Sequence, residues 1–175
     1  VYNILSALSV ISIYKDVLKL HEKIFLDFRC PAGRGDRSII KIGNKKINLI
    51  DESYNSNPLS LKSALKNYDN IDTKKYRKYL LLGDMMELGA HSKKLHRSIA
   101  PLINKTNIDK VFVMGKMVRE IFNNIMKVKR GRILVNKLGI FEFIKKDLNN
   151  NDYLMIKASN ATGFNSIVNN LKRLN

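Results

Sequence analysis

Hydrophobic residues are distributed along this chain with two different spacings. Five short, nearly continuous apolar runs occur between residues 47 and 157, in the segments INLID, YLLLGD, VFVMG, RILV and YLMIK. Runs of this length are typical of strands buried on both faces of a parallel sheet. Elsewhere, apolar residues recur every three or four positions, which is the spacing of amphipathic helices. These stretches are residues 61–68, 95–102, 118–125, 141–148 and 164–171.

The alternation of strands and helices predicts an α/β fold with a Rossmann-like, mostly parallel sheet. Right-handed crossovers between parallel strands place helices on both faces of such a sheet. Ahead of these elements, SIIKIGNKKINLI predicts two strands joined by a hairpin turn at Gly43 and Asn44. Pro101 is expected to kink or shorten the helix in which it lies.

The first thirty residues carry two further helical patterns, over residues 1–11 and 17–28. The segment RCPAGRGDR follows, and its Pro31 and two glycines do not fit a regular element. We therefore predict a domain boundary here, with a short helical remnant of one domain at residues 1–33 and the Rossmann-like domain at residues 34–175. Because the chain starts with Val, we expect it to be the tail of a longer protein.

Composition and charge narrow the classes of function only in part. The net charge of +17 favours polyanionic partners such as nucleic acid. However, the lysines are scattered through nearly every segment, and the aromatic residues are not interleaved with them as in a base-stacking surface. A lysine-rich solvated surface explains the charge better, so no nucleic acid is expected. The single Cys30 fits a reducing cytoplasm, and no apolar stretch is long enough for membrane insertion.

Polar residues follow three of the predicted strands, at the point where each strand ends. They are Asp51, Glu52, Asn55 and Asn57 after the first, Asp84 and Glu87 after the second, and Lys157, Ser159 and Asn160 after the third. In open α/β sheets, ligands bind outside the carboxyl ends of the strands. The sequence therefore predicts that these three loops converge on one binding edge.

Each of these residues also has a structural interpretation. Asn57 precedes a proline, as expected for the first cap of a helix, and Asp84 and Glu87 would suit helix capping. An acid such as Glu52 could end a strand in solvent or accept hydrogen bonds from a ribose diol. Lys157 could be solvated or form an anion cradle with a nearby helix N-terminus.

Two other features concern metals and phosphates. His91 and His96 are five residues apart, no Cys or acid completes a metal set, and no zinc or other metal site is predicted. His96 adjoins an apolar stripe and is expected to be packed or hydrogen-bonded. Arg34 lies between two glycines, which suits a guanidinium that swings onto a phosphate. No GxxxxGK[ST] motif is present, so a triphosphate cradle would lie elsewhere.

Taken in order, five segments closely resemble the carboxy-terminal part of the Mur ligase family. The segments are VYNILSALSV, PAGRG, IDESYNSNP, LLGDMMELG with the following His96, and IKASNATGFNSIV. The resemblance covers essentially the whole chain, and IDESYNSNP and LLGDMMELG are its most specific parts.

The resemblance implies a cytoplasmic ligase of peptidoglycan precursor synthesis that depends on ATP and Mg²⁺. The members that add D-alanyl-D-alanine to UDP-N-acetylmuramoyl-tripeptide match best. In such enzymes ATP converts a carboxylate into an acyl phosphate, which an amine then attacks. Family members have three domains, so residues 1–33 would end the central ATPase domain and supply the hinge. The P-loop and the Mg²⁺ ligands would lie in that central domain, and this chain alone is expected to be inactive, with no catalytic residue of its own.

Family roles carry over to particular positions only as implications of the resemblance. Asn3 would bind adenine, and Arg34 would reach the ATP phosphates. The ribose-binding acid would be Glu52, with Asp51 beside it, where the family has Asp. Asn55 and Asn57 would lie near the nucleotide.

The site of the incoming dipeptide would use the other two loops. Its residues would be Asp84, Glu87, Lys157, Ser159 and Asn160. Asn160 stands where the family pattern has Arg, and Ala158 stands where it has Gly.

Two other interpretations stay open. The chain could come from another ligase of the Mur or folylpolyglutamate type, or it could be a basic Rossmann-like module that binds nucleic acid. The segments SYNSNP and GDMMELG favour the ligase that adds the dipeptide. We expect this protein to act as a monomer.

Overall fold

The computed structural model describes residues 2–21, 23 and 31–173, with the side chains of residues 2 and 3 outside the description. The chain divides into two units, Val1–Cys30 and Pro31–Asn175. In the first unit, helix α1 spans Tyr2–Ile11, which confirms the first predicted helix. Of the pattern over residues 17–28, Val17–Lys19 form a 3₁₀ turn, η1, and residues 22 and 24–28 lie outside the described residues.

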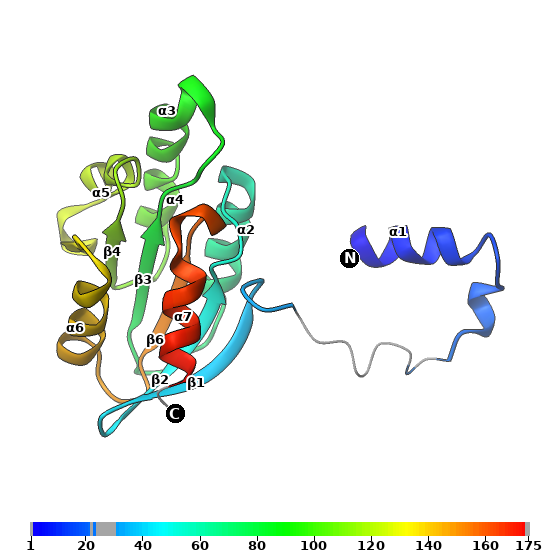
Figure 1. Cartoon of the computed structure of the whole chain (residues 1–175), viewed down its shortest axis with the longest axis horizontal. Helices are drawn as coiled ribbons and strands as arrows, with labels where there is room; N and C mark the ends of the chain where they lie inside the picture. Colours follow the sequence, from blue (N-terminus) through cyan, green and yellow to red (C-terminus); the bar gives the residue numbers. More distant parts are fainter. Residues whose placement is uncertain (1, 22, 24–30, 174–175) are drawn as a thin grey trace. The chain divides into compact units, whose positions relative to one another are not determined.

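The second unit is built on one sheet, which has six strands among the described residues (Figure 1). In spatial order the strands are β1 (Asp36–Ile42), β2 (Lys45–Glu52), β6 (Tyr153–Lys157), β3 (Lys78–Gly83), β4 (Lys110–Met114) and β5 (Arg130–Ile133). Strand β1 pairs antiparallel with β2, and the other four pairings are parallel. Gly43 forms the predicted hairpin turn with a φ of 60°, a value that glycine adopts without steric cost.

Helices cover both faces of the sheet, as predicted. They are α2 (Pro58–Asp69), α3 (Ser92–Arg97), α4 (Ala100–Lys105), α5 (Arg119–Asn124), α6 (Lys137–Asp147) and α7 (Phe164–Lys172), with short 3₁₀ turns η2 (Gly89–His91), η3 (Lys127–Lys129) and η4 (Asn160–Thr162). Pro101 lies in the first turn of α4, so the helix predicted around residues 95–102 is split into α3 and α4.

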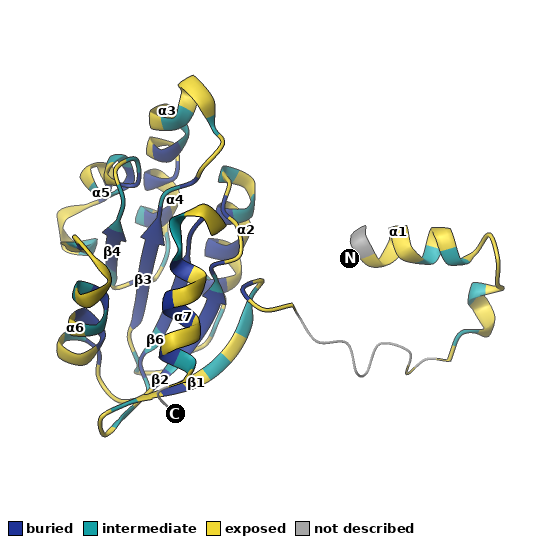
Figure 2. Ribbon diagram, viewed as in Figure 1, coloured by how far each residue is buried: buried dark blue, intermediate teal, exposed yellow. Residues whose placement is uncertain are grey.

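The core consists of two layers, one on each side of the sheet. Figure 2 shows the central strands coloured as buried. Strand β3 is buried throughout, and its side chains alternate between the layers: Leu81 packs with α6 and α7, whereas Leu80 and Leu82 pack with α2, α4 and α5. Full burial of a leucine contributes roughly 1.5–3 kcal/mol. This two-sided burial is why the strand sequences are continuously apolar rather than alternating.

Close packing at the end of β3 brings the site together. A Cβ at Gly83 would lie 2.7 Å from both Ala158 Cβ and a ring carbon of Phe164, so only glycine lets the segment after β6 approach β3 this closely. Within the described part of the chain, none of the helices has the length and apolarity needed to cross a bilayer.

Candidate functional site

The loops that follow β2, β3 and β6 are hydrogen-bonded directly to one another. The hydroxyl of Ser159, after β6, donates to Ser56 O at 3.0 Å and accepts from Met86 N–H at 2.9 Å. Ser159 N–H donates to Asp84 O at 3.2 Å. The prediction that the three loops converge on one edge is therefore confirmed, and buried Ser159 is the residue that joins them.

Lys157 is the buried cation of this edge, with a side chain that is only 1% exposed. Its ammonium donates to Asn55 O at 2.9 Å and lies 3.3 Å from the carboxylate of Glu52. Burial lowers the pKa of Lys157 below its ordinary value, although the charge of Glu52 opposes this change. The Glu52 side chain is 22% exposed, so one acid at this edge remains accessible beside the cation.

The adjacent acids Asp51 and Glu52 have different environments. Asp51 Oδ1 accepts hydrogen bonds from the N–H and the hydroxyl of Ser53, and its Oδ2 lies 2.7 Å from Lys172 Nζ. Lys172 also contacts Asp36 Oδ2 at 2.7 Å. Asp51 thus ties α7 to the end of β2, whereas the side chain of Glu52 remains partly exposed.

Two asparagines of the first loop also differ. Asn57 caps α2: its side chain accepts from Ser60 N–H at 2.8 Å, and the Ser60 hydroxyl accepts from Asn57 N–H, which forms a capping box. The structural interpretation of Asn57 is therefore correct. Asn55 is exposed, and its side-chain oxygen accepts from the next N–H. Its carbonyl, rather than its side chain, contacts Lys157.

Asp84 fixes the loop after β4. Its two carboxylate oxygens accept from Val118 N–H at 2.7 Å and Lys116 N–H at 3.0 Å. A Cβ at Gly115 would lie 2.4 Å from Asp84 Oδ1, so glycine is required for this approach. The sequence had placed Asp84 in the dipeptide site, and that role stays a prediction alongside this structural one.

His96 is fully buried and makes two hydrogen bonds, as predicted. Its Nε2 accepts from Met85 N–H at 3.0 Å, and its Nδ1 lies 2.8 Å from Ser92 O. This pattern assigns the proton to Nδ1. Glu87, in the loop after β3, is exposed and has a positive φ of 63°.

The remaining predicted residues are Asn160, Asn3 and Arg34. Asn160 is exposed, and its side-chain oxygen accepts from Asn165 Nδ2 at 2.8 Å. Asn3 lies in α1, but its side chain is outside the described residues. Arg34 is exposed at the start of the second unit, with its guanidinium carbon 4.2 Å from the ring centroid of Tyr54.

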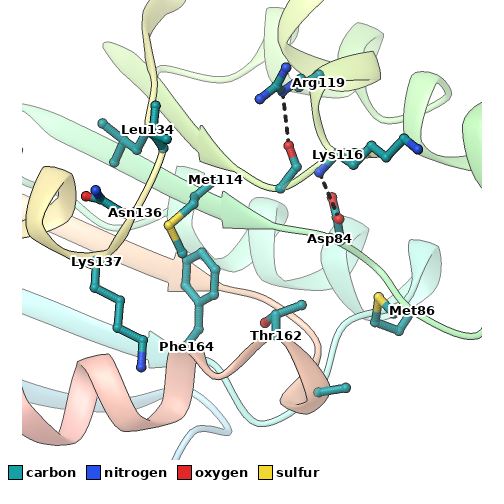
Figure 3. Close-up of a pocket in the computed structure, with 13 residues that line it drawn as sticks. Asp84, Met86, Met114, Lys116, Arg119, Leu134, Asn136, Lys137, Thr162 and Phe164 are labelled. Carbon is teal, nitrogen blue, oxygen red and sulfur yellow. Dashed lines mark hydrogen bonds between the residues drawn. The ribbon is translucent and has the colours of Figure 1, made fainter.

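A cavity of about 790 Å³ opens beside these loops (Figure 3). It is formed by the segments after β3, β4 and β5 and by the start of α7. Its basic residues are Lys116, Arg119 and Lys137, and its apolar residues include Met86, Met114, Leu134 and Phe164. Sequence reasoning missed these basic residues because they resemble the many other lysines and arginines. The available signal was their position directly after β4 and β5.

Metal-ligating side chains are not clustered among the described residues. No group of three metal-ligating side chains occurs among them. Both oxygens of Asp84 and of Asp51 already accept hydrogen bonds, and Glu52 is paired with Lys157. In contrast, the side chains of Arg34 and Lys157 carry positive charge that attracts anions such as phosphates. The Glu52 carboxylate can accept hydrogen bonds from hydroxyl groups such as those of a ribose.

The fold and this edge define the class of protein as a Rossmann-like α/β domain with a charged binding edge at the carboxyl ends of its strands. The chain belongs to the family described as "Mur ligase, glutamate ligase domain", whose model matches residues 37–160.

Three similar curated proteins share the name UDP-N-acetylmuramoyl-tripeptide–D-alanyl-D-alanine ligase. The protein of Bacillus subtilis is 28% identical over 71% of this chain and 28% of its own length. That of Rickettsia prowazekii is 26% identical over 95% of this chain and 36% of its own length. That of Buchnera aphidicola subsp. Baizongia pistaciae is 32% identical over 81% of this chain and 30% of its own length. The chain therefore spans about a third of the length of these relatives.

Solved structures show the same fold. The MurF ligase from Thermotoga maritima in complex with ADP matches 97% of this chain and 36% of its own, with a TM-score of 0.71 and 18% identity. MurF from Acinetobacter baumannii matches 83% of this chain and 31% of its own, with a TM-score of 0.67 and 18% identity. The family match and the names of the curated relatives do not favour the alternative of a nucleic-acid-binding module.

Proposed function

We propose that this chain is the carboxy-terminal part of an ATP-dependent ligase that joins D-alanyl-D-alanine to UDP-N-acetylmuramoyl-tripeptide. Family membership and the names of its relatives support this proposal. The observation that carries it is the hydrogen-bonded edge at which Lys157, Glu52 and Asn55 meet beside Arg34.

The reaction needs activation because a carboxylate is a poor electrophile. Transfer of the γ-phosphoryl group of ATP to the tripeptide carboxylate creates a phosphate leaving group, and attack by the dipeptide amine forms the amide and releases phosphate. Most of the catalysis comes from positioning and from neutralising charge. Arg34 would supply positive charge near the phosphates, Glu52 would accept hydrogen bonds from the ribose, and Asn3 would contact adenine. Lys157 and Ser159 would line the dipeptide site, as the resemblance implies.

The rest of the site would lie in the remaining two thirds of such an enzyme. We assign the phosphate-binding loop and the Mg²⁺ ligands to that part, because both carboxylate oxygens of Asp51 and of Asp84 already accept hydrogen bonds. Residues 1–33 would then end the central ATP-binding domain. The complete enzyme would act as a cytoplasmic monomer.

The cavity beside the edge suits the incoming dipeptide. D-Alanyl-D-alanine has two methyl groups and one carboxylate, and the cavity combines apolar residues such as Met114 and Phe164 with three basic residues. Asn160 cannot supply the positive charge that the family pattern has at that position. We therefore assign carboxylate recognition to Lys137, together with Lys116 and Arg119.

The test is a phosphate-release assay on the full-length protein that contains this chain. Release should require ATP, the UDP-linked tripeptide and D-alanyl-D-alanine together, and replacing the dipeptide by glutamate or another single amino acid should abolish it. The 175-residue chain alone should show no turnover. Turnover by this chain alone, or a preference for a different acceptor, would overturn the proposal.

A further inference from the structure

The backbone on both sides of Arg34 is fixed to the end of strand β2. Gly35 N–H donates to Asp51 O at 2.7 Å, and Tyr54 N–H donates to Gly33 O at 3.0 Å. Gly33 N–H donates to the carboxylate of Asp36 at 2.7 Å. The glycines around Arg34 predict a flexible arm, but in the structure they form a hydrogen-bonded strap.

Both glycines are needed for this close packing rather than for flexibility. Gly33 and Gly35 have φ values of 76° and 91°, which strain residues with a side chain. A Cβ at Gly33 would also lie 2.8 Å from Tyr54 N. The strap is therefore packed against, and hydrogen-bonded to, the loop that contains Tyr54.

The side chain of Arg34 is also held. Its guanidinium carbon lies 4.2 Å from the ring centroid of Tyr54, within the range of a cation–π contact. The positive charge of Arg34 contributes, after burial, to the lowered pKa of Lys157, so the stacked guanidinium acts electrostatically on the edge. Tyr54 is 46% exposed, which leaves this stack at the surface where a ligand can reach it.

We propose that Tyr54 is a positioning residue that presets the Arg34 guanidinium for the phosphates, so that Arg34 travels with its domain instead of swinging on its own. This inference rests on the proposed function, in which Arg34 neutralises phosphate charge. Fixing a flexible arginine side chain on ligand binding costs conformational entropy. Because the Tyr54 ring already holds Arg34 in the free protein, less of this entropy is lost when the nucleotide binds.

The experiment compares variants of the full-length ligase. Tyr54→Leu should lower kcat/KM for ATP by roughly two- to fivefold, which is the range of an exposed cation–π contact, and should leave KM for the dipeptide unchanged. Tyr54→Phe keeps the ring and should behave as the native protein. Leu59→Ala removes another exposed apolar side chain near the same loop and serves as the control.

A double-mutant cycle separates positioning from a structural role. Arg34→Ala should lower turnover by roughly a hundredfold, and adding Tyr54→Leu to it should cause no further loss. If Arg34→Ala has no effect, the proposed role of Arg34 fails. If Arg34→Ala is impaired but Tyr54→Leu is fully active, or if Tyr54→Leu causes the same loss in both backgrounds, the positioning proposal is overturned.

A measurement without turnover completes the test. In NMR spectra of the 175-residue chain, the Arg34 side-chain Nε–H signal should show a ring-current shift that persists in Tyr54→Phe and disappears in Tyr54→Leu. A signal that is identical in all three proteins would contradict the preset position of Arg34, whatever the ligase activity.

Discussion

Lys172, in the last turn of α7, lies 2.7 Å from the carboxylate of Asp51 at the end of β2. The same ammonium lies 2.7 Å from Asp36 at the start of β1. The Asp51 side chain is only 3% exposed, and this ammonium is its ion-pair partner. A single lysine near the end of the chain thus fixes both acids next to the strap that carries Arg34.

Replacing Lys172 should destabilise the domain. Lys172→Met leaves the buried Asp51 without its cation, and we expect a loss of about 2–3 kcal/mol in the free energy of unfolding. The measurement is urea unfolding followed by circular dichroism. Lys62→Met, at an exposed position of α2, is the matched control and should change stability by less than about 0.5 kcal/mol. Equal effects of the two variants would show that the bridge contributes nothing specific.

The contribution of Lys172 should depend on pH in the alkaline range. Burial tends to lower the pKa of Lys172, but its hydrogen bonds to Asp36 and Asp51 outweigh burial and raise the pKa. A group with a raised pKa contributes its full stability below the unfolded value, about 10.4 for lysine, and loses it as the pH rises through the folded value. The stability difference between the native protein and Lys172→Met should therefore stay constant from about pH 7 to 9 and shrink above about 10.4. A constant difference up to about pH 11 would contradict this.

Asn57 should matter for stability through its side-chain oxygen. Asn57→Ala removes the cap of α2 and should cost about 1 kcal/mol in the free energy of unfolding. Asn57→Ser keeps a capping oxygen and should restore most of that loss. Thermal unfolding of both variants checks this. If Asn57→Ala unfolds like the native protein but raises KM for ATP in the full-length enzyme, Asn57 acts on the nucleotide and not as a cap.

Lys137 should affect the dipeptide and not the nucleotide. Lys137→Met removes one basic residue from the cavity, and we expect KM for D-alanyl-D-alanine to rise about tenfold, as for the loss of a charge-assisted hydrogen bond. KM for ATP should not change. Lys146→Met, at an exposed position of the same helix, is the control. An unchanged KM for the dipeptide would exclude Lys137 from carboxylate recognition.

Some of the site could be predicted from position along the chain. Parallel strands must end at the same edge, so the segments after β2, β3 and β6 had to meet. The capping role of Asn57 was also readable, because the proline after it marks a helix start. In both cases the controlling interactions are local or follow from strand direction.

Other parts depended on contacts between distant residues. Asp51 and Glu52 are neighbours and chemically alike, yet Lys172, more than a hundred residues later, makes one structural and leaves the other accessible. The two glycines beside Arg34 suggested flexibility, but packing against Tyr54 made them a fixed strap.

The sequence by itself determined the α/β class, the strand and helix order and the edge at which the polar loops gather. It did so because burial on both faces of a sheet requires continuous apolar runs, and strand direction sets where each run ends. Only the tertiary structure decided which acid and which lysines face the site, and how the side chain of Arg34 is oriented. A charged side chain is exposed or buried according to the partner that the fold brings to it, and charge spread through the whole sequence does not identify that partner.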